Sequence, residues 1–222
     1  GTLKVTGSIY CGTCLGGSGV AGTASAITTV NTNGTLEVTN WGWVGSLGDR
    51  YYDATALVIN GGTLRYSGPN TSAANSSTRG FTVGASGATF ESATAGTTWS
   101  LLDGNSTSSN YKSVFNGNVT FQGLGDFNVS HIISGANTLT KSGAGTLTLS
   151  GQNTYTGTTT INAGTLAFAS TGKIYYNSGS SMVTTTATVN SGAVLDLQSW
   201  DWAGSLGYLN FDATSLVING GT

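Results

Sequence analysis

Charged side chains are scarce in this sequence of 222 residues. Asp, Glu, Lys and Arg make up only 7% of it, against roughly a quarter in an ordinary soluble protein. The formal net charge is −2. A nucleic-acid-binding surface needs clustered Lys and Arg to displace counterions from phosphates, and a polybasic membrane patch needs the same residues. Seven Lys and Arg in the whole chain exclude both of these function classes.

Long apolar runs and targeting signals are also missing. No stretch approaches the roughly 20 apolar residues of a membrane-spanning helix, so we expect no membrane insertion by this segment. No charged region followed by an apolar run marks a signal peptide at the start. The chain opens at Gly1 and stops at Thr222 in what reads as the middle of strand motifs. We therefore expect it to be a piece of a longer polypeptide.

Cysteine and histidine are nearly absent. The two cysteines, Cys11 and Cys14, lie among small residues that do not predict the helix of a thioredoxin-like site. A zinc site normally takes four ligands, and His131 is the single histidine. The sequence predicts a local disulfide between Cys11 and Cys14 in an oxidising compartment, with free thiols as the alternative. It predicts no metal and no cofactor.

Glycine, by contrast, contributes 35 residues, and the chain repeats itself. Residues 41–63 reappear as 200–222, at a constant offset of 159 positions. Both copies begin with Trp-x-Trp and end with Leu-Val-Ile-Asn-Gly-Gly-Thr. Similarity at a fixed spacing is typical of repeat proteins. We interpret residues 1–222 as one continuous solenoid segment of a larger repetitive protein, made of one long repeat and part of the next.

A shorter motif, Gly-Thr-Leu followed by alternating polar and apolar residues, recurs inside the long repeat. It begins at Gly1, Gly34, Gly62, Gly145 and Gly164, with a looser copy at Gly192. Such alternation predicts a strand with one buried face, with Leu147 and Leu149 pointing inward. The glycine before each strand permits a corner with positive φ.

These strands predict an all-β fold in which successive coils stack into a parallel β-helix. In such a stack each coil pairs with the coils above and below it, so charges are not needed to specify the pairing. Dense glycine and β-branched residues disfavour helices. A β-sandwich is the competing fold, and it is less favoured because the recurring strand starts carry one motif.

Residues 132–166 carry the most specific pattern in the chain. They contain Leu-Thr-Lys-Ser-Gly-Ala-Gly-Thr-Leu-Thr-Leu-Ser-Gly, then Asn-Thr-Tyr-Thr-Gly, then Thr-Thr-Ile-Asn-Ala-Gly-Thr-Leu. This order closely resembles the autotransporter-associated β-strand repeat, also called the passenger-associated transport repeat. The resemblance implies a right-handed parallel β-helix that is exported to the bacterial surface. Members of this family serve as surface stalks, adhesins and matrix components. The Trp-x-Trp segments are not part of the usual motif.

The acids do not form the pattern of an enzyme. None of the nine Asp and Glu sits in an Asp-x-Asp pair, and no calcium-binding ladder is present. Asp53 and Asp212 occupy equivalent positions in the two copies, which favours a structural role in a turn. We interpret His131 as a solvated histidine at a strand end. The sequence therefore predicts no catalytic residues.

The aromatic residues of the Trp-x-Trp segments are the predicted contact residues. Two interpretations remain open: they form an interface or glycan-binding platform, or they fold back over an open part of the stack. These residues are Trp41, Trp43, Tyr51, Tyr52, Trp200, Trp202, Tyr208 and Phe211.

A flat threonine ladder that binds ice or another crystal surface is a remote alternative. Thr-x-Thr pairs occur at Thr138/Thr140, Thr146/Thr148, Thr154/Thr156 and Thr158/Thr160. Because these pairs are 8, 8 and 4 positions apart, we expect them on different sides of the coils.

Together these patterns predict a structural segment of an extracellular bacterial surface rod, filament or adhesin. Its expected partners are copies of itself, joined end to end or side by side, and surface glycans. A carbohydrate-binding or polysaccharide-processing β-helix is the alternative.

Overall fold

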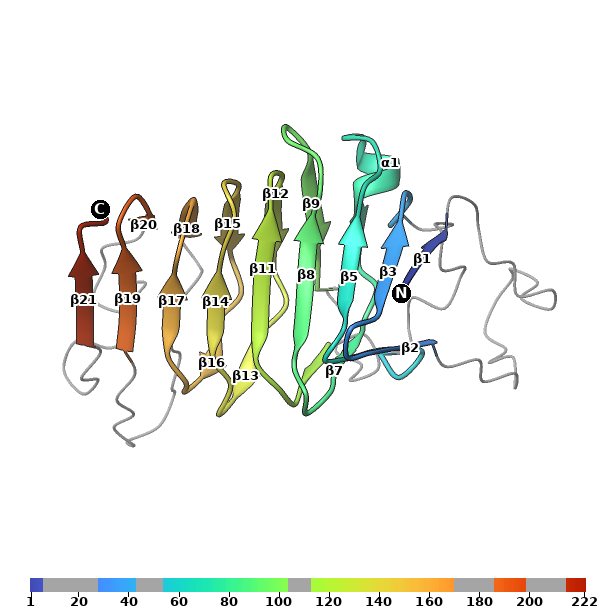
Figure 1. Ribbon diagram of the computed structural model, residues 1–222, viewed down its shortest axis with the longest axis horizontal. Helices are drawn as coiled ribbons and strands as arrows, with labels where there is room; N and C mark the ends of the chain where they lie inside the picture. The colour runs from blue at the N-terminus through green and yellow to red at the C-terminus, as the bar shows by residue number, and fades with distance from the viewer. Residues whose placement is uncertain (6–27, 43–53, 104–112, 170–185, 199–214) are drawn as a thin grey trace.

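The computed structural model describes residues 1–5, 28–42, 54–103, 113–169, 186–198 and 215–222. Within these ranges the chain is a parallel β-helix, as predicted from the sequence (Figure 1). The single helix among the described residues is one turn, α1 (Ser72–Asn75). Extension of the solenoid through all of residues 1–222 stays a prediction.

The front sheet contains nine parallel strands and runs along the whole described length (Figure 1). Its strands, in spatial order, are β1 (Thr2–Val5), β3 (Thr35–Val38), β5 (Thr63–Tyr66), β8 (Ala88–Ser92), β11 (Val119–Gly123), β14 (Leu139–Lys141), β17 (Thr159–Ile161), β19 (Thr186–Asn190) and β21 (Ser215–Asn219).

Two further faces complete the coils. The back sheet consists of β6 (Ser76–Ser77), β9 (Thr98–Leu101), β12 (Asp126–Val129), β15 (Thr146–Leu149), β18 (Thr165–Phe168) and β20 (Val194–Leu197). The lower face consists of β2 (Thr28–Asn31), β4 (Leu57–Asn60), β7 (Thr82–Val83) and β10 (Val114–Phe115), followed by β13 (Ser134–Gly135) and β16 (Thr154–Tyr155).

The coils turn in the right-handed sense. In Figure 1 the strands of the front sheet point upward, the chain descends behind them, and each later coil lies one step further to the left. This is the hand that nearly all parallel crossover connections adopt.

Coil length varies along the rod, as the register of the front sheet shows. Thr120 pairs with Thr140, and Thr140 pairs with Thr160, so the coils that run from one of these threonines to the next are short. The first coil is much longer, because it runs from Thr2 to its partner Thr35. We call the coils from β1 to β11 the long coils and those from β11 to β18 the motif coils.

All six Gly-Thr-Leu-type motifs begin strands, which confirms the prediction from alternation. They begin β1, β3, β5, β15, β18 and β20. Leu147 and Leu149 are fully buried, as predicted. The corner at Gly164 shows why glycine is needed: its φ is +67°, and a Cβ there would lie 2.5 Å from two carbonyl oxygens of the preceding coil.

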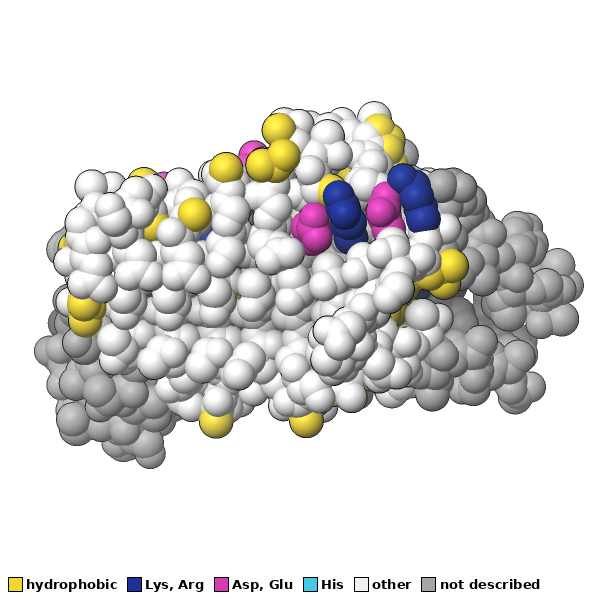
Figure 2. Space-filling model, in the orientation of Figure 1, with side chains coloured by type: hydrophobic (Ala, Val, Ile, Leu, Met, Phe, Trp, Pro, Cys, Tyr) yellow, Lys and Arg dark blue, Asp and Glu magenta, His cyan; other side chains and the backbone are white. Residues whose placement is uncertain are grey.

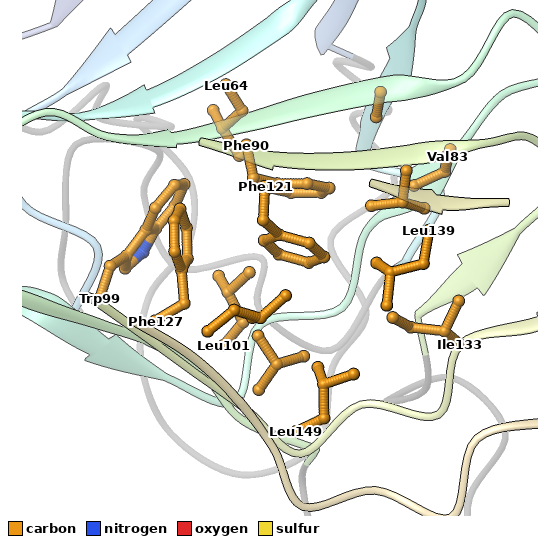
Figure 3. Close-up of a cluster of buried hydrophobic side chains, with 14 of the residues drawn as sticks. Leu64, Val83, Phe90, Trp99, Leu101, Phe121, Phe127, Ile133, Leu139 and Leu149 are labelled. Atoms are coloured by element: carbon orange, nitrogen blue, oxygen red, sulfur yellow. The ribbon is translucent and has the colours of Figure 1, made fainter. Parts of the chain in front are cut away.

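The interior of the long coils and of the first motif coil, as far as β12, is rich in aromatic rings. Trp99 and Phe127 from the back sheet face Phe90 and Phe121 from the front sheet (Figure 3). Trp99 packs against Phe127 at 5.6 Å and Tyr66 at 5.5 Å between ring centroids. Large rings contribute most of the buried apolar area, so they stabilise this part of the stack. Past β12, Leu147 takes the interior position of Phe127, and Lys141 takes the interior position of Phe121.

Candidate functional site

Trp41, one of the predicted contact residues, lies in the core. Its side chain is 1% exposed and meets Trp99 edge to face, with ring centroids 5.3 Å apart. The guanidinium carbon of Arg79 lies 5.8 Å from the centre of the Trp41 ring, which is cation–π distance. For Trp41, this burial agrees with the second interpretation of its segment, that the aromatic residues fold back over the stack, and not with an interface or glycan contact. Its indole is buried because it closes the aromatic core of the long coils.

The remaining predicted site residues lie outside the described residues. These are Trp43, Tyr51, Tyr52, Trp200, Trp202, Tyr208 and Phe211, and the predicted disulfide partners Cys11 and Cys14. Their roles stay predictions.

The outer surface of the front sheet carries a column of threonines. Strand register stacks one threonine from each of eight consecutive coils, and in the seven coils after the first these side chains are partly exposed. The column is Thr2, Thr35, Thr63, Thr89, Thr120, Thr140, Thr160 and Thr188. Adjacent members are about 4.8 Å apart, the spacing of paired strands.

Two of the Thr-x-Thr pairs form a ladder, contrary to the prediction from the sequence. Thr140 pairs with Thr160, so Thr138/Thr140 and Thr158/Thr160 lie on the same face of successive coils. Thr186 and Thr188 add the next coil. The prediction compared each Thr-x-Thr pair with the next pair along the chain. Residues that stack are instead separated by one full coil, so the distance to the next pair does not decide which threonines stack.

The other two pairs do lie on other faces of the coils, as expected. Thr146/Thr148 belong to β15 of the back sheet, and Thr154 begins β16 of the lower face.

A second column of outward-facing side chains on the front sheet is charged at one end of the rod and carries amides at the other. At the N-terminal end it is charged: Lys4 Nζ lies 2.7 Å from Glu37 Oε1, and Arg65 Nε lies 3.5 Å from Glu91 Oε1. Figure 2 shows Lys or Arg and Asp or Glu side chains alternating at one place on a face that carries few other charges.

Toward the C-terminus, the positions of this column are occupied by asparagines. Asn190 donates to Asn162 at 2.9 Å. Asn219 donates in turn to Asn190 at 3.3 Å. Side-chain amides thus link successive coils where the charged pairs end.

The charged column does not have the chemistry of a catalytic pair. Hydrogen bonds from Lys4 and from the Ser67 hydroxyl lower the pKa of Glu37, so it stays ionised. A general acid would need a carboxyl with a raised pKa. Among the described residues, no group of three His, Cys, Asp or Glu side chains could hold a metal ion. Likewise, no helix in the described part is long and apolar enough to cross a membrane.

His131 is buried, which corrects the expectation of a solvated histidine. It is 1% exposed and packs edge to face on Phe81, with ring centroids 5.2 Å apart. Burial lowers its pKa to about 4, although a hydrogen bond with the Arg79 backbone opposes the shift. This burial could not be predicted from the sequence, because a lone histidine carries no pattern that shows whether its side chain faces the interior or the solvent.

A serine lies beside His131 in a small pocket that Asp103 also lines. Ser113 Oγ is 3.5 Å from His131 Nε2, the outer limit for a hydrogen bond, and it accepts the Phe81 backbone N–H at 3.1 Å. A histidine with a pKa near 4 is a weak base at neutral pH, so the pair is poorly suited to nucleophilic catalysis. The geometry fits a polar link between neighbouring coils.

Lys141 is a charged side chain that points into the stack. It occupies the inward column between Phe121 and Ile161, and it is 1% exposed. Its ammonium donates to three corner carbonyls, those of Ser142 at 3.1 Å, Gly143 at 2.7 Å and Ala163 at 3.2 Å. Burial lowers the pKa of Lys141 to about 8, with Asp126 opposing the shift, so the amine remains protonated at neutral pH. The motif lysine thus joins two stacked corners.

Further polar residues of the motif are also internal. Asn153 accepts the Ile133 N–H at 3.0 Å and donates to the Gly151 carbonyl at 3.1 Å. The Tyr155 hydroxyl lies 2.7 Å from Thr159 Oγ1, and both side chains are buried. These polar groups are therefore partnered, which offsets the cost of burying them in a low-dielectric interior.

The comparisons agree with a structural role for the motif coils. Residues 139–168 match the family model of the passenger-associated transport repeat. The match covers β14 to β18, the coils that contain Lys141, Asn153 and Tyr155. This segment therefore carries that repeat, a structural repeat associated with the passenger regions of autotransporters. No curated protein and no solved structure matches the chain.

Proposed function

We propose that this chain is a structural segment of an extracellular rod on a bacterial surface, without catalytic activity of its own. The continuous nine-stranded front sheet is the observation that carries this proposal. Its register holds from β1 to β21, and its outer face is largely uncharged. The passenger-associated repeat at 139–168 supports the surface location.

The partners proposed for the rod are further copies of its own repeat. Among the described residues, each end strand of the front sheet has one edge without a neighbouring strand. Apolar side chains are exposed there: Leu3 is 61% exposed and Ile218 is 54% exposed. A further coil, from a longer chain or from another copy, would pair at such an edge and cover these side chains. End-to-end stacking would cover both edges and extend the sheet.

Analytical ultracentrifugation of the chain over a range of concentrations tests this assembly. We expect the average mass to rise with concentration as edges pair. Ile218 lies in the inward column and Val217 in the outward one. Ile218→Lys places a charge where the next coil would pack, so it should abolish growth, whereas Val217→Lys is the matched control and should assemble like the parent chain.

A parent chain that stays monomeric at every concentration would contradict non-covalent stacking. Equal assembly by both lysine variants would contradict the role of the β21 edge.

A second candidate function, binding to an ordered crystal face such as ice, is favoured by the threonine column. Thr138/Thr140, Thr158/Thr160 and Thr186/Thr188 form a small lattice on one flat face, about 4.8 Å along the rod and about 7 Å across it. An assay of ice recrystallisation tests this candidate. Thr140→Lys should abolish inhibition and Thr148→Lys, on the back sheet, should not. Absence of inhibition by the parent chain would exclude it.

The carbohydrate-binding alternative depends on aromatic residues outside the described ranges, and it stays a prediction.

A further inference from the structure

The two copies of the long repeat fold in the same way locally. β2 pairs with β4 through Thr29↔Val58 and Val30↔Ile59. β19 pairs with β21 through the residues that the sequence offset makes equivalent, Thr188↔Val217 and Val189↔Ile218. One antiparallel bridge recurs at the same offset, as Asn31↔Gly61 and Asn190↔Gly220. The long repeat of the sequence is thus also a repeat of strand register.

The corner that follows the first strand recurs in both copies as well. Asn33 has a φ of +64° and Gly192, its equivalent, has a φ of +78°. The Gly34 N–H donates to the Asn31 carbonyl at 2.8 Å, and the Ala193 N–H donates to the Asn190 carbonyl at 3.0 Å. Equal pairing and equal corners mean that the same structural unit occurs twice.

The two units nevertheless lie on different faces of the coil. In the first copy β2 and β4 lie on the lower face and β3 on the front sheet. In the second copy the equivalent strands β19 and β21 lie on the front sheet and β20 on the back sheet. β1, which pairs with β3 in the front sheet, corresponds through its Gly-Thr-Leu motif to β18, which pairs with β20 in the back sheet, at an offset of 163 positions instead of 159. Each strand of the second unit lies one face further along the coil than its equivalent in the first unit.

We infer that consecutive long repeats are turned by about a third of a turn around the rod axis. Six strand-to-strand steps along the front sheet separate β3 from β19. The equivalent of β3 is β20, which follows β19 on the next face of the coil. The long repeat therefore spans six complete coils and one additional face of the three, so it is not a whole number of coils.

The rotation distributes equivalent surfaces around the rod. Three repeats, or about 19 coils, restore the starting orientation after roughly 90 Å at about 4.8 Å per coil. Any feature that recurs once per repeat then points in three directions in succession, so contacts made through such a feature would form on all sides of the rod. This geometry is a property of the chain itself and does not depend on the proposed surface function.

Electron spin-echo distances between paired labels test the rotation. One label is placed at Thr35 and the second at either Thr188 or Val194, in a chain that carries Cys11→Ser and Cys14→Ser. Thr188 lies in the column of Thr35, six coils away, which predicts a backbone separation of about 29 Å. Val194 is the equivalent of Thr35 in the second copy, but it lies on the back sheet.

The rotation predicts that the Thr35–Thr188 distance is shorter than the Thr35–Val194 distance, because only the second pair crosses the rod. If the repeats were in phase, the order would reverse, since equivalent residues would lie in one column. A Thr35–Val194 distance equal to or shorter than the Thr35–Thr188 distance overturns the inference. All three labelled positions are partly exposed, and far-ultraviolet circular dichroism equal to that of the parent chain checks the fold of each variant.

Discussion

The long coils near the N-terminus and the short motif coils fill the same interior differently. Around Trp99, rings from three parts of the coil meet: Tyr66 and Phe90 from the front sheet, Trp41 from the chain after β3, and Phe127 from the back sheet. In the motif coils, aliphatic side chains share the interior with Lys141, Asn153 and the Tyr155–Thr159 pair. The long coils are thus held by ring packing, and the motif coils by leucines together with polar links to the corners.

This difference explains what the family motif encodes. In the motif coils the corners bring backbone carbonyls close to the interior, within reach of the Lys141 ammonium. Lysine and asparagine at fixed positions partner backbone groups at these corners, so the spacing of the motif follows from the geometry of a short coil. The long coils need no such motif because ring packing tolerates many sequences of similar volume.

Truncation of Trp99 should have the largest effect on stability. Its side chain is fully buried, and Trp99→Ala should lower the free energy of unfolding by about 3–5 kcal/mol, because it removes ring contacts and leaves a cavity. Urea denaturation measures the change. Leu124→Ala is the control: Leu124 is 60% exposed, and its loss should cost within about 0.5 kcal/mol. Similar losses for both variants would contradict the aromatic core.

Acid should weaken the stack through His131. The unfolded chain takes up a proton near the ordinary pKa of 6.5, whereas the folded chain does so only near 4. Stability present above pH 6.5 is therefore lost as the pH falls toward 4, by about 1.4 kcal/mol per pH unit and about 3 kcal/mol in total. Urea denaturation of the parent and His131→Phe across this range should show a shallower pH dependence for the variant. Parallel curves would mean that His131 is not buried in solution.

Loss of the Lys141 ammonium should destabilise the motif coils. Lys141→Met keeps most of the apolar stem but leaves three corner carbonyls without their donor, at a cost of about 1–3 kcal/mol. Lys4→Met is the matched control: its side chain is 53% exposed, and surface ion pairs contribute about 0–1 kcal/mol. Thermal and urea unfolding compare the two. A Lys141→Met variant as stable as the parent would show that the corners do not depend on the ammonium.

Removal of the Glu37 charge should have the smallest effect. Glu37→Gln breaks the ion pair with Lys4, whose side chain is 53% exposed whereas that of Glu37 is 11% exposed. Because solvent reaches the ammonium, the free energy of unfolding should fall by less than about 1 kcal/mol. The difference from the parent chain should shrink further at about 1 M salt. A larger loss that salt does not change would indicate that the carboxylate acts through the Ser67 hydrogen bond rather than through its charge.

Local strand structure could be predicted from the sequence because alternation and corner glycines act over a few residues. Each Gly-Thr-Leu-type motif begins a strand, and the motif of residues 132–166 indicated the parallel β-helix that the structure shows.

Features that depend on coil length could not be predicted. One coil joins Thr140 to Thr160 and another joins Thr2 to Thr35, so the chain alone does not reveal which threonines stack or which face a repeat occupies. Burial of Trp41, His131 and Lys141 depends on contacts between coils, and single residues carry no local sign of it.

Electron microscopy of the native material is the measurement that tests the central claim, that this segment belongs to a surface rod built from stacked coils. We expect long rods with an axial rise of roughly 30 Å per long repeat, which is six coils and one face at about 4.8 Å per coil, and the same orientation again after roughly 90 Å. Compact particles without an axial repeat would contradict that claim.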